Sequence, residues 1–295
     1  MESTPSRHTR PQTPASPAGA LSQGIRYLVA VLVVGLWIAI GFAFRMTGNN
    51  ANIYLLLTIP AVLIVQLVIR RQPLREVWVR GSPRFRFDAI TGILFVLLAI
   101  VPALTAVQGV VTHNWPQMLY GLAAIGGAIG AAYALRSGRR RMAWQLPLCV
   151  VVTCIIGVGL NVGNILLIDA RQIHHPKPLI GAVTAGYYFL LYLPALFVVE
   201  EVFFRGTLDS YLHERERGVG WLSVIVVSVL WGLWHLPVTY TGHGSLVKVL
   251  VELLVGQLAL GIPLSIFWRV SRNLAVPAAA HAVNDAIRNV IVGLP

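Results

Sequence analysis

Nine apolar runs divide the chain, and each has at least about the length that a helix needs to cross a lipid bilayer. A bilayer core of about 30 Å requires ~20 residues of α-helix, whose backbone groups find hydrogen-bond partners within the same segment. We therefore expect an all-α, polytopic membrane protein with about nine transmembrane helices. The predicted spans are residues 27–44, 52–69, 89–111, 117–135, 143–168, 180–212, 220–237, 246–268 and 274–293.

The balance of charged and apolar residues supports a lipid environment for most of the surface. Hydrophobic residues make up 56% of the chain and charged residues only 12%, whereas a soluble domain carries about 25% charged residues. The formal net charge of +12 would suit a nucleic-acid-binding protein. The arginines, however, lie in short loops between the spans, where membrane topology places them. We therefore expect the lipid bilayer to be a partner and nucleic acid not to be one.

Loop charges predict how the chain is oriented in the membrane, because cytoplasmic loops carry an excess of Lys and Arg. With the N-terminus inside, 17 such residues fall in cytoplasmic segments and 4 in the opposite loops. We therefore expect a cytoplasmic N-terminus and, with nine spans, an external C-terminus. Arginine far outnumbers lysine, as in GC-rich bacterial genomes, so we expect the cell membrane of a bacterium. The cytoplasmic set is Arg7, Arg10, Arg26, Arg70, Arg71, Arg75, Arg80, Arg84, Arg86, Arg136, Arg139, Arg140, Arg141, Arg215, Arg217, Arg269 and Arg272, and the opposite set is Arg45, Arg171, Lys177 and Lys248.

The chain divides into three parts. Residues 1–25 are rich in Ser, Thr and Pro and are expected to form a disordered cytoplasmic tail. Residues 26–179 hold five spans without a recognisable motif, whereas residues 180–295 hold four spans with ionisable groups at bilayer depth. Such groups are costly in lipid and commonly mark functional sites, so the catalytic core is predicted in this last part. The span 180–212 is too long for one simple crossing and contains Pro194, so we expect a bend or an extension into the cytosol.

Two adjacent glutamates begin the group of buried polar residues. Glu201 and Arg205 are four residues apart, which on an α-helix is the spacing of an ion pair. Pairing reduces the cost of burying both charges. Glu200 is turned by ~100° on the helix and is not neutralised by that pair, which suits a general base. A polar clamp between helices would explain the same residues equally well.

Depth along the helices predicts which residue meets Glu200. A cytoplasmic turn is expected near residues 214–220. Counting back to Glu200 or forward to His235 gives fourteen residues in each direction, which is ~21 Å of α-helix. An antiparallel hairpin therefore places Glu200 and His235 at the same depth, with Trp231 on the face of His235.

The last span carries a third polar group. His281 shares a helix face with Asn284 and Asp285, which follow it by three and four residues. Asp285 is also three residues before Arg288, and their pairing would leave His281 and Asn284 free as hydrogen-bond donors. Three helices that each bring an acid or a histidine favour a catalytic site over an internally satisfied polar stripe.

In this order, the residues resemble the motif set of the CPBP family of intramembrane proteases, which includes the type II CAAX prenyl proteases. The family motifs are EExxxR, FxxxH and HxxxN or HxxxD, and they are similar to residues 200–205, 231–235 and 281–285. The resemblance covers about residues 180–295. It implies an all-α, multi-pass fold that hydrolyses a peptide bond of a membrane-associated peptide or protein.

The resemblance also implies a role for each matching residue. Glu200 with His235 would activate the attacking water, His281 with the residue four positions along would hold the oxyanion, and Arg205 would be structural. The sequence departs from the pattern at Trp231, where the family usually has Phe, and at Asp285. An ionised Asp cannot donate to an oxyanion, so either Asp285 is protonated or Asn284 takes that role.

The sequence gives weaker evidence on whether the site holds a metal ion than on which residues form it. Residues 213–217 begin like the zinc motif HExxH, but Arg217 stands at the second His position, so this motif is absent. A zinc site formed by Glu200, His235 and His281 remains an alternative. We expect a site without a cofactor, in which a glutamate activates the water.

Two functions of other classes compete with an endopeptidase. One is a non-catalytic relative that binds peptides in the membrane as an immunity or maturation partner, although peptide binding alone does not require Glu200, His235 and His281 together. The other is a proton-coupled transporter that uses Glu200 and Glu201 as a relay. Transporters commonly show paired halves, whereas here the charged groups at bilayer depth lie in one half.

Overall fold

The computed structural model describes residues 21–81, 85, 87–168, 176–213, 218–240 and 245–293. These residues form a helical bundle with no β-strand, and their one isolated bridge joins Val79 and Asn273. Residues 1–20 of the predicted tail lie outside the described part. The first helix begins at Gln23, capped by the Ser22 side chain that accepts from the Ile25 amide, so the predicted tail of residues 1–25 ends earlier than expected.

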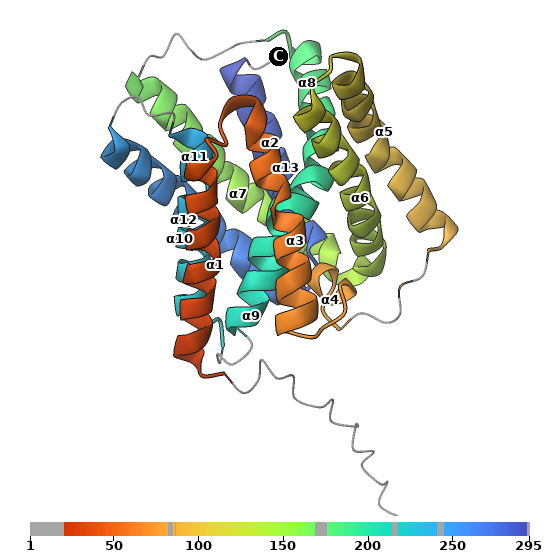
Figure 1. The fold of residues 1–295 in the computed structure, drawn as a ribbon. Coiled ribbons are helices and arrows are strands. Elements are labelled where there is room, and N and C mark those ends of the chain that lie inside the picture. Colours follow the sequence, from red (N-terminus) through yellow and green to blue (C-terminus); the bar gives the residue numbers. More distant parts are fainter. Residues whose placement is uncertain are drawn as a thin grey trace, which may run out of the picture.

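Within the described residues, eight helical segments are long and apolar enough to cross a membrane (Figure 1). They are α1 (Gln23–Ala43), α2 to η3 (Ala51–Ile69), α5 (Ala89–Val111), α6 (Trp115–Ser137), Met142–Leu160 of α7 (Arg139–Ile168), α8 to α9 (Pro178–His213), α10 to α11 (Trp221–Thr239) and α12 (Leu246–Ser271). The composite spans consist of α2 (Ala51–Leu56), α3 (Thr58–Leu63) and η3 (Ile64–Ile69); of α8 (Pro178–Leu196), η5 (Phe197–Asp209) and α9 (Ser210–His213); and of α10 (Trp221–Trp234) and α11 (Leu236–Thr239). Short helices η2 (Gly48–Asn50) and α4 (Arg75–Trp78) lie in connections.

The ninth predicted span forms α13 (Ala275–Val292), but it is not among the segments apolar enough to cross a membrane by themselves. The described residues therefore hold eight such segments, which agrees with the prediction of about nine to within one. Helix α13 is less apolar because it lies inside the bundle, where it packs against α7, α8 and α12 and buries most of one face. Its polar residues are covered by protein and need not be compatible with lipid.

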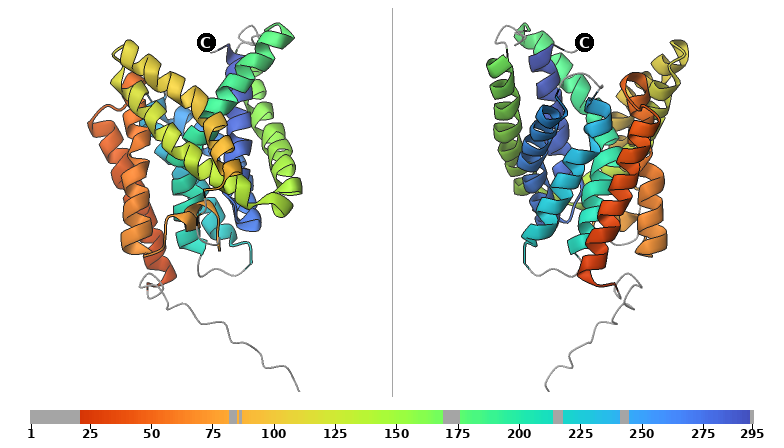
Figure 2. Two further views of the ribbon diagram at one scale, coloured as in Figure 1. Left: turned by 90° about the vertical axis from the view of Figure 1, so that its right-hand side faces the viewer. Right: turned by 60° about the vertical axis from the view of Figure 1, so that its left-hand side comes forward.

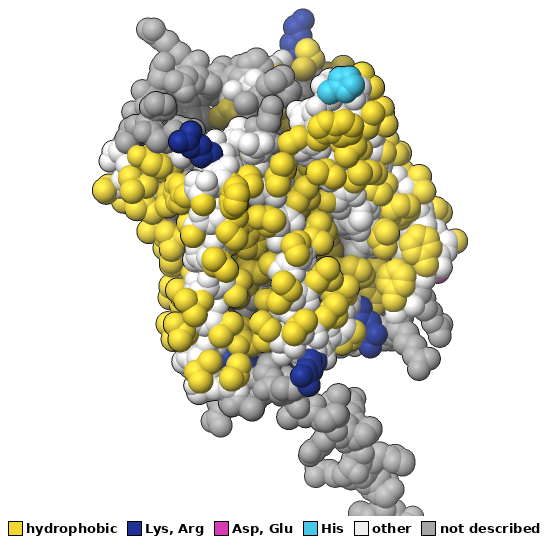
Figure 3. Space-filling view, viewed as in Figure 1, with side chains coloured by type: hydrophobic (Ala, Val, Ile, Leu, Met, Phe, Trp, Pro, Cys, Tyr) yellow, Lys and Arg dark blue, Asp and Glu magenta, His cyan; other side chains and the backbone are white. Residues whose placement is uncertain are grey.

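The outer surface supports the membrane assignment. Large apolar side chains are exposed along the outer helices; Leu36, Val107 and Ile155 are 66%, 60% and 71% exposed. Figure 3 shows apolar side chains over the flank of the bundle, with Lys and Arg near its two ends. Water would disfavour such a surface, whereas hydrocarbon chains cover it at no cost.

One end of the bundle carries most of the described arginines, and we call it the arginine-rich end. It includes α4, α9, the start of α10 and the end of α12 (Figure 1). The opposite end includes α11 and the C-terminal end of α13. The arginines that define the arginine-rich end are Arg70, Arg71, Arg75, Arg80, Arg136, Arg269 and Arg272.

The long sixth span changes helix type three residues after Pro194. Proline lacks the amide hydrogen that the regular ladder needs, and the chain continues from Phe197 to Asp209 as the π-helix η5. The side chain of Thr207 bonds the carbonyl of Val202, five residues earlier, in keeping with this wider helix. The spacing of Glu201 and Arg205 predicted an α-helix here, whereas the backbone is π-helical. Such segments are frequent at functional sites.

Small residues of α6 allow this helix to pack closely against the start of η5. A Cβ atom on Gly127 would lie 2.1 Å from the carbonyl oxygen of Pro194, and one on Gly130 would lie 2.8 Å from the ring of Phe197. Glycine is therefore required where α6 crosses the start of η5. Helices α1 to α3 lie on the opposite side of the bundle from α7 (Figure 2), so η5 is enclosed by the motif-free part of the chain as well as by the last helices.

Candidate active site

A cavity of about 290 Å³ lies among α7, η5, α10, α11, α12 and α13. Its lining includes every residue to which the sequence analysis gave a catalytic role, brought together from three helices. Glu201 and Arg205 are fully buried and do not line it. The lining residues are Gly157, Leu160, Glu200, Trp231, His235, Thr239, Glu252, Leu253, Gly256, Gln257, Leu260, His281, Asn284, Asp285 and Arg288.

Glu200 and His235 meet, as the counting of helix depth predicted. The distance from Glu200 Oε2 to His235 Nε2 is 3.7 Å. The same carboxylate oxygen accepts a hydrogen bond of 2.9 Å from the indole Nε1 of Trp231. A phenylalanine at this position could not donate that bond, so the departure from the family motif changes how Glu200 is held.

The ring of His235 is oriented by the end of its own helix. Its Nδ1 lies 2.8 Å from the carbonyl oxygen of Trp231. A carbonyl only accepts, so this contact assigns the hydrogen of the neutral ring to Nδ1 and leaves a lone pair on Nε2. Helix α10 ends beside this residue, and Pro237 follows in α11. The lone pair of His235 Nε2 therefore faces Glu200 across the cavity.

The predicted ion pair between Glu201 and Arg205 is present, with 3.2 Å between Oε1 and Nη1. The guanidinium also lies 4.2 Å from the centre of the Trp231 ring, a cation–π contact. Glu201 has a further partner that the sequence did not indicate, because its Oε1 lies 2.9 Å from His281 Nδ1. The expectation that His281 is free as a donor therefore applies to Nε2 and not to Nδ1.

The polar face of α13 completes the cavity floor. The predicted pair of Asp285 with Arg288 is present at 3.1 Å, and Asp285 Oδ2 lies 3.8 Å from His281 Nε2. Asn284 is buried, and its Oδ1 has no hydrogen-bond partner among the described residues. A Cβ on Gly157 would lie 2.1 Å from that oxygen. Only glycine at this position of α7 leaves room for the amide.

The alternative zinc site does not assemble from these side chains. In the part of the chain that the structure describes, no three His, Cys, Asp or Glu side chains converge as a metal-binding group. Glu200, His235 and His281 line the cavity without forming such a group. A site without a cofactor stays a prediction.

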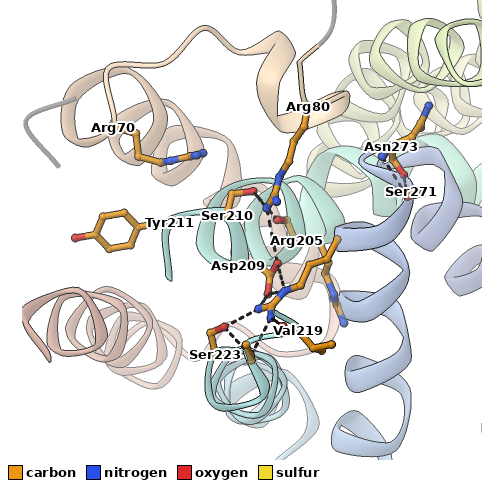
Figure 4. A network of polar contacts seen from close by, with 12 residues as sticks. Arg70, Arg80, Arg205, Asp209, Ser210, Tyr211, Val219, Ser223, Ser271 and Asn273 are labelled. Atoms are coloured by element: carbon orange, nitrogen blue, oxygen red, sulfur yellow. Dashed lines mark hydrogen bonds and ion pairs between the residues drawn. The ribbon is translucent and has the colours of Figure 1, made fainter. Parts of the chain in front are cut away.

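Sequence reasoning missed a second buried ionic cluster, near the arginine-rich end. Asp209 of η5 is fully buried and accepts from Arg269 Nε of α12, at 3.1 Å to Oδ1 and 3.0 Å to Oδ2. Arg80 Nη2 lies 3.9 Å from Oδ2 and donates to Ser210 Oγ at 2.6 Å. Figure 4 shows Asp209 beside Arg80 and Ser210. The signal available in the sequence was an acid eight residues after Glu201, inside a predicted span.

The motif-free helices also contact the site, through aromatic residues. The Tyr54 hydroxyl of α2 donates to the carbonyl of Trp234 at 2.8 Å, directly before His235. Trp37 of α1 packs edge-on against Trp234 and Phe203, at ring distances of 5.6 Å and 5.2 Å. The first spans therefore support the point where α10 ends and His235 begins the connection to α11.

Comparison with known proteins identifies the part of the chain that forms this site. The family described as "Rce1-like: Type II CAAX prenyl endopeptidase Rce1-like" matches residues 182–287. That stretch includes the EExxxR-like segment, Trp231 and His235, and the polar residues 281–285. No curated protein and no solved structure gave a significant match.

Proposed function

We propose that this chain, whose residues 182–287 match the Rce1-like type II CAAX prenyl endopeptidase family, is an intramembrane endopeptidase in which Glu200 and His235 activate the attacking water. The substrate is a membrane-associated polypeptide, hydrolysed in the cavity. We also propose that the protein is a multi-pass component of a bacterial cell membrane with its N-terminus in the cytoplasm.

The observation that carries this proposal is the spacing of Glu200 and His235. At 3.7 Å, Glu200 Oε2 and His235 Nε2 are too far apart for a direct hydrogen bond, yet one water oxygen can lie about 2.8 Å from both. Both atoms face the cavity as acceptors, so such a water donates its two hydrogens to them. Its lone pair is then directed away from the pair, toward a substrate carbonyl.

Proton transfer follows from the same arrangement. As the water oxygen bonds to the carbonyl carbon, its proton passes to Glu200. When the carbon–nitrogen bond breaks, Glu200 returns that proton to the leaving amine. The indole of Trp231 remains bound to Glu200 Oε2 and keeps the carboxylate in the position required for both steps.

When the water attacks, negative charge develops on the substrate carbonyl oxygen. A hydrogen-bond donor on the side of the cavity opposite Glu200 and His235 must stabilise this charge. Asp285 is paired with Arg288, so as a carboxylate it can only accept. His281 donates through Nδ1 to Glu201, and between Glu201 and Asp285 it can carry a second proton on Nε2. We assign the oxyanion contacts to His281 Nε2 and the amide of Asn284, with Asp285 as a positioning residue.

A comparison of membrane proteomes tests the function without a known substrate. A deletion strain would be complemented with the wild-type chain, Glu200→Gln or Glu76→Gln. The last variant is a matched control, because Glu76 lies near the arginine-rich end and accepts from the Gly81 amide, as glutamine also can. We expect the same uncleaved polypeptides to accumulate in the deletion and Glu200→Gln strains only. Normal processing with Glu200→Gln would instead support the non-catalytic alternative.

A further inference from the structure

The exposed and buried residues of the cavity lie at different depths. Its floor, formed by Glu200, Trp231, His281 and Asn284, is buried. Its rim consists of the exposed lining residues Leu160, Thr239 and Glu252. The cavity therefore opens from a closed floor toward the helix ends that carry these rim residues.

Helix positions place the rim far from the arginine-rich end. Thr239 is the last residue of α11, eighteen residues after Trp221 begins α10, or ~27 Å of helix. Glu252 precedes Arg269 by seventeen residues on α12, or ~26 Å. Both distances approach the ~30 Å thickness of a bilayer core. The rim thus belongs to the membrane half opposite the arginines.

The floor is closed toward the arginine-rich end. Below it lie the buried pair of Glu201 with Arg205 and the cluster of Asp209 with Arg269. The side chains of Phe204, Leu208 and Trp268, all at most 2% exposed, fill the same region. A polypeptide that approached from this side would have to separate two buried ion pairs and this packing, which costs several kcal/mol.

We propose that the substrate polypeptide reaches the cavity from the membrane half opposite the arginine-rich end, which the charge rule makes extracytoplasmic. This rests on the proposed endopeptidase function and names its substrate class as an extended, membrane-anchored segment of an exported polypeptide. The bond that is cut lies in the extracytoplasmic half of the membrane.

The proposed reaction and the cavity lining indicate the form of that segment. In an α-helix each peptide carbonyl is engaged in the hydrogen bond of the helical ladder. The substrate therefore binds unwound, so that its carbonyl is free to meet the water between Glu200 and His235. Leu253, Gly256 and Leu260 of α12 form an apolar wall beside it, whereas Glu252 adds a carboxylate at the rim.

Cysteine labelling in intact cells tests this proposal separately from catalysis. The background would be the full chain with Cys149→Ser and Cys154→Ser, since both native cysteines are free thiols. Single cysteines would replace Thr239 at the rim or Val219, exposed in the turn that begins α10. These positions lie at opposite ends of the single span formed by α10 and α11, so each is the control for the other.

A membrane-impermeant maleimide should label Thr239→Cys in intact cells and Val219→Cys only after permeabilisation. The reverse pattern would place the rim in the cytoplasm and overturn the proposal, whether or not the protein is a protease. A bulky maleimide on Thr239→Cys should also reduce cleavage at least 10-fold. The same label on Leu179→Cys, which is highly exposed at the start of α8, should not. Full cleavage by labelled Thr239→Cys would refute access through the rim, whereas absence of cleavage by the wild-type chain would refute the function alone.

Discussion

Two buried ionic clusters on the π-helix η5 differ in how completely their polar atoms are paired. The cluster near the arginine-rich end joins Asp209 to Arg269. Each of the three guanidinium nitrogens has a partner, including the Gly220 carbonyl at 2.8 Å and Ser223 Oγ at 2.7 Å. The cavity cluster is less complete, because Glu201 Oε2 and two nitrogens of Arg205 have no hydrogen-bond partner among the described residues.

This difference in pairing suggests that one cluster stabilises the fold and the other serves catalysis. A buried polar group without a partner costs about 1–3 kcal/mol, and natural proteins retain such costs mainly at functional sites. The paired cluster ties η5 to α12 and to the turn before α10. The incompletely paired cluster borders a cavity and positions His281. We therefore expect changes in the first to alter stability alone and changes in the second to alter catalysis.

The largest expected effect belongs to the residues that contact the water. Glu200→Gln should lower the cleavage rate by roughly 10²–10⁴, the contribution of a general base, while thermal stability in detergent stays near that of the wild type. His235→Ala should have a similar effect. Because both act on one water, the double variant should be little worse than either single change. Multiplicative losses in a purified cleavage assay would show that the two residues act independently.

Glu201→Gln and Asp209→Asn provide the direct comparison of the clusters. Each removes the counter-charge of a buried arginine, so each should lower the free energy of unfolding by about 3–5 kcal/mol. Glu201 also holds His281, so Glu201→Gln should further reduce the activity of each folded molecule. The free energy of unfolding and the cleavage rate per folded molecule would be measured for both variants. An equal loss of specific activity in Asp209→Asn would contradict the division between the clusters.

Substitution of the two buried tryptophans of these clusters should have a smaller effect, and it tests the hydrogen bond to Glu200 alone. Trp231→Phe keeps an aromatic ring beneath Arg205 but removes the indole donor to Glu200, a bond to a charged group worth about 1.5–3 kcal/mol. We expect a fall in kcat of about 10- to 100-fold with little change in KM.

Trp268→Phe is the matched control for this change. The ring of Trp268 lies 4.8 Å from the Arg80 guanidinium, and its Nε1 has no hydrogen-bond partner within the described part of the chain. Phenylalanine preserves that stacking, so kcat should be unchanged. Full activity in Trp231→Phe would show that the indole bond does not position Glu200.

Metal removal should have no effect on activity. We propose that the water is activated by Glu200 and His235, and no group of three His, Cys, Asp or Glu side chains in the described residues is arranged to hold a metal ion. Purified protein treated with a strong chelator should retain its cleavage rate and its melting temperature. One tightly bound zinc per chain, whose removal abolishes cleavage and whose return restores it, would refute this.

The sequence alone determined the helical membrane fold and the meeting of Glu200 with His235. Hydropathy is a local property of each segment, and equal distances from one turn place two residues at the same depth whatever surrounds them. The sequence also indicated the pairs of Glu201 with Arg205 and Asp285 with Arg288, because residues three or four positions apart lie on the same face of a helix.

Only the tertiary structure decided which distant residues pair with the buried charged side chains. Asp209 and Arg269 are 60 residues apart, and Glu201 and His281 are 80 apart, so no local spacing predicts either contact. The π-helical backbone of η5 also depends on neighbours, since glycines of α6 allow close packing where it begins. Local patterns determine which residues are available at each depth, but the partners of a buried charge are chosen by helices that pack together from distant parts of the chain.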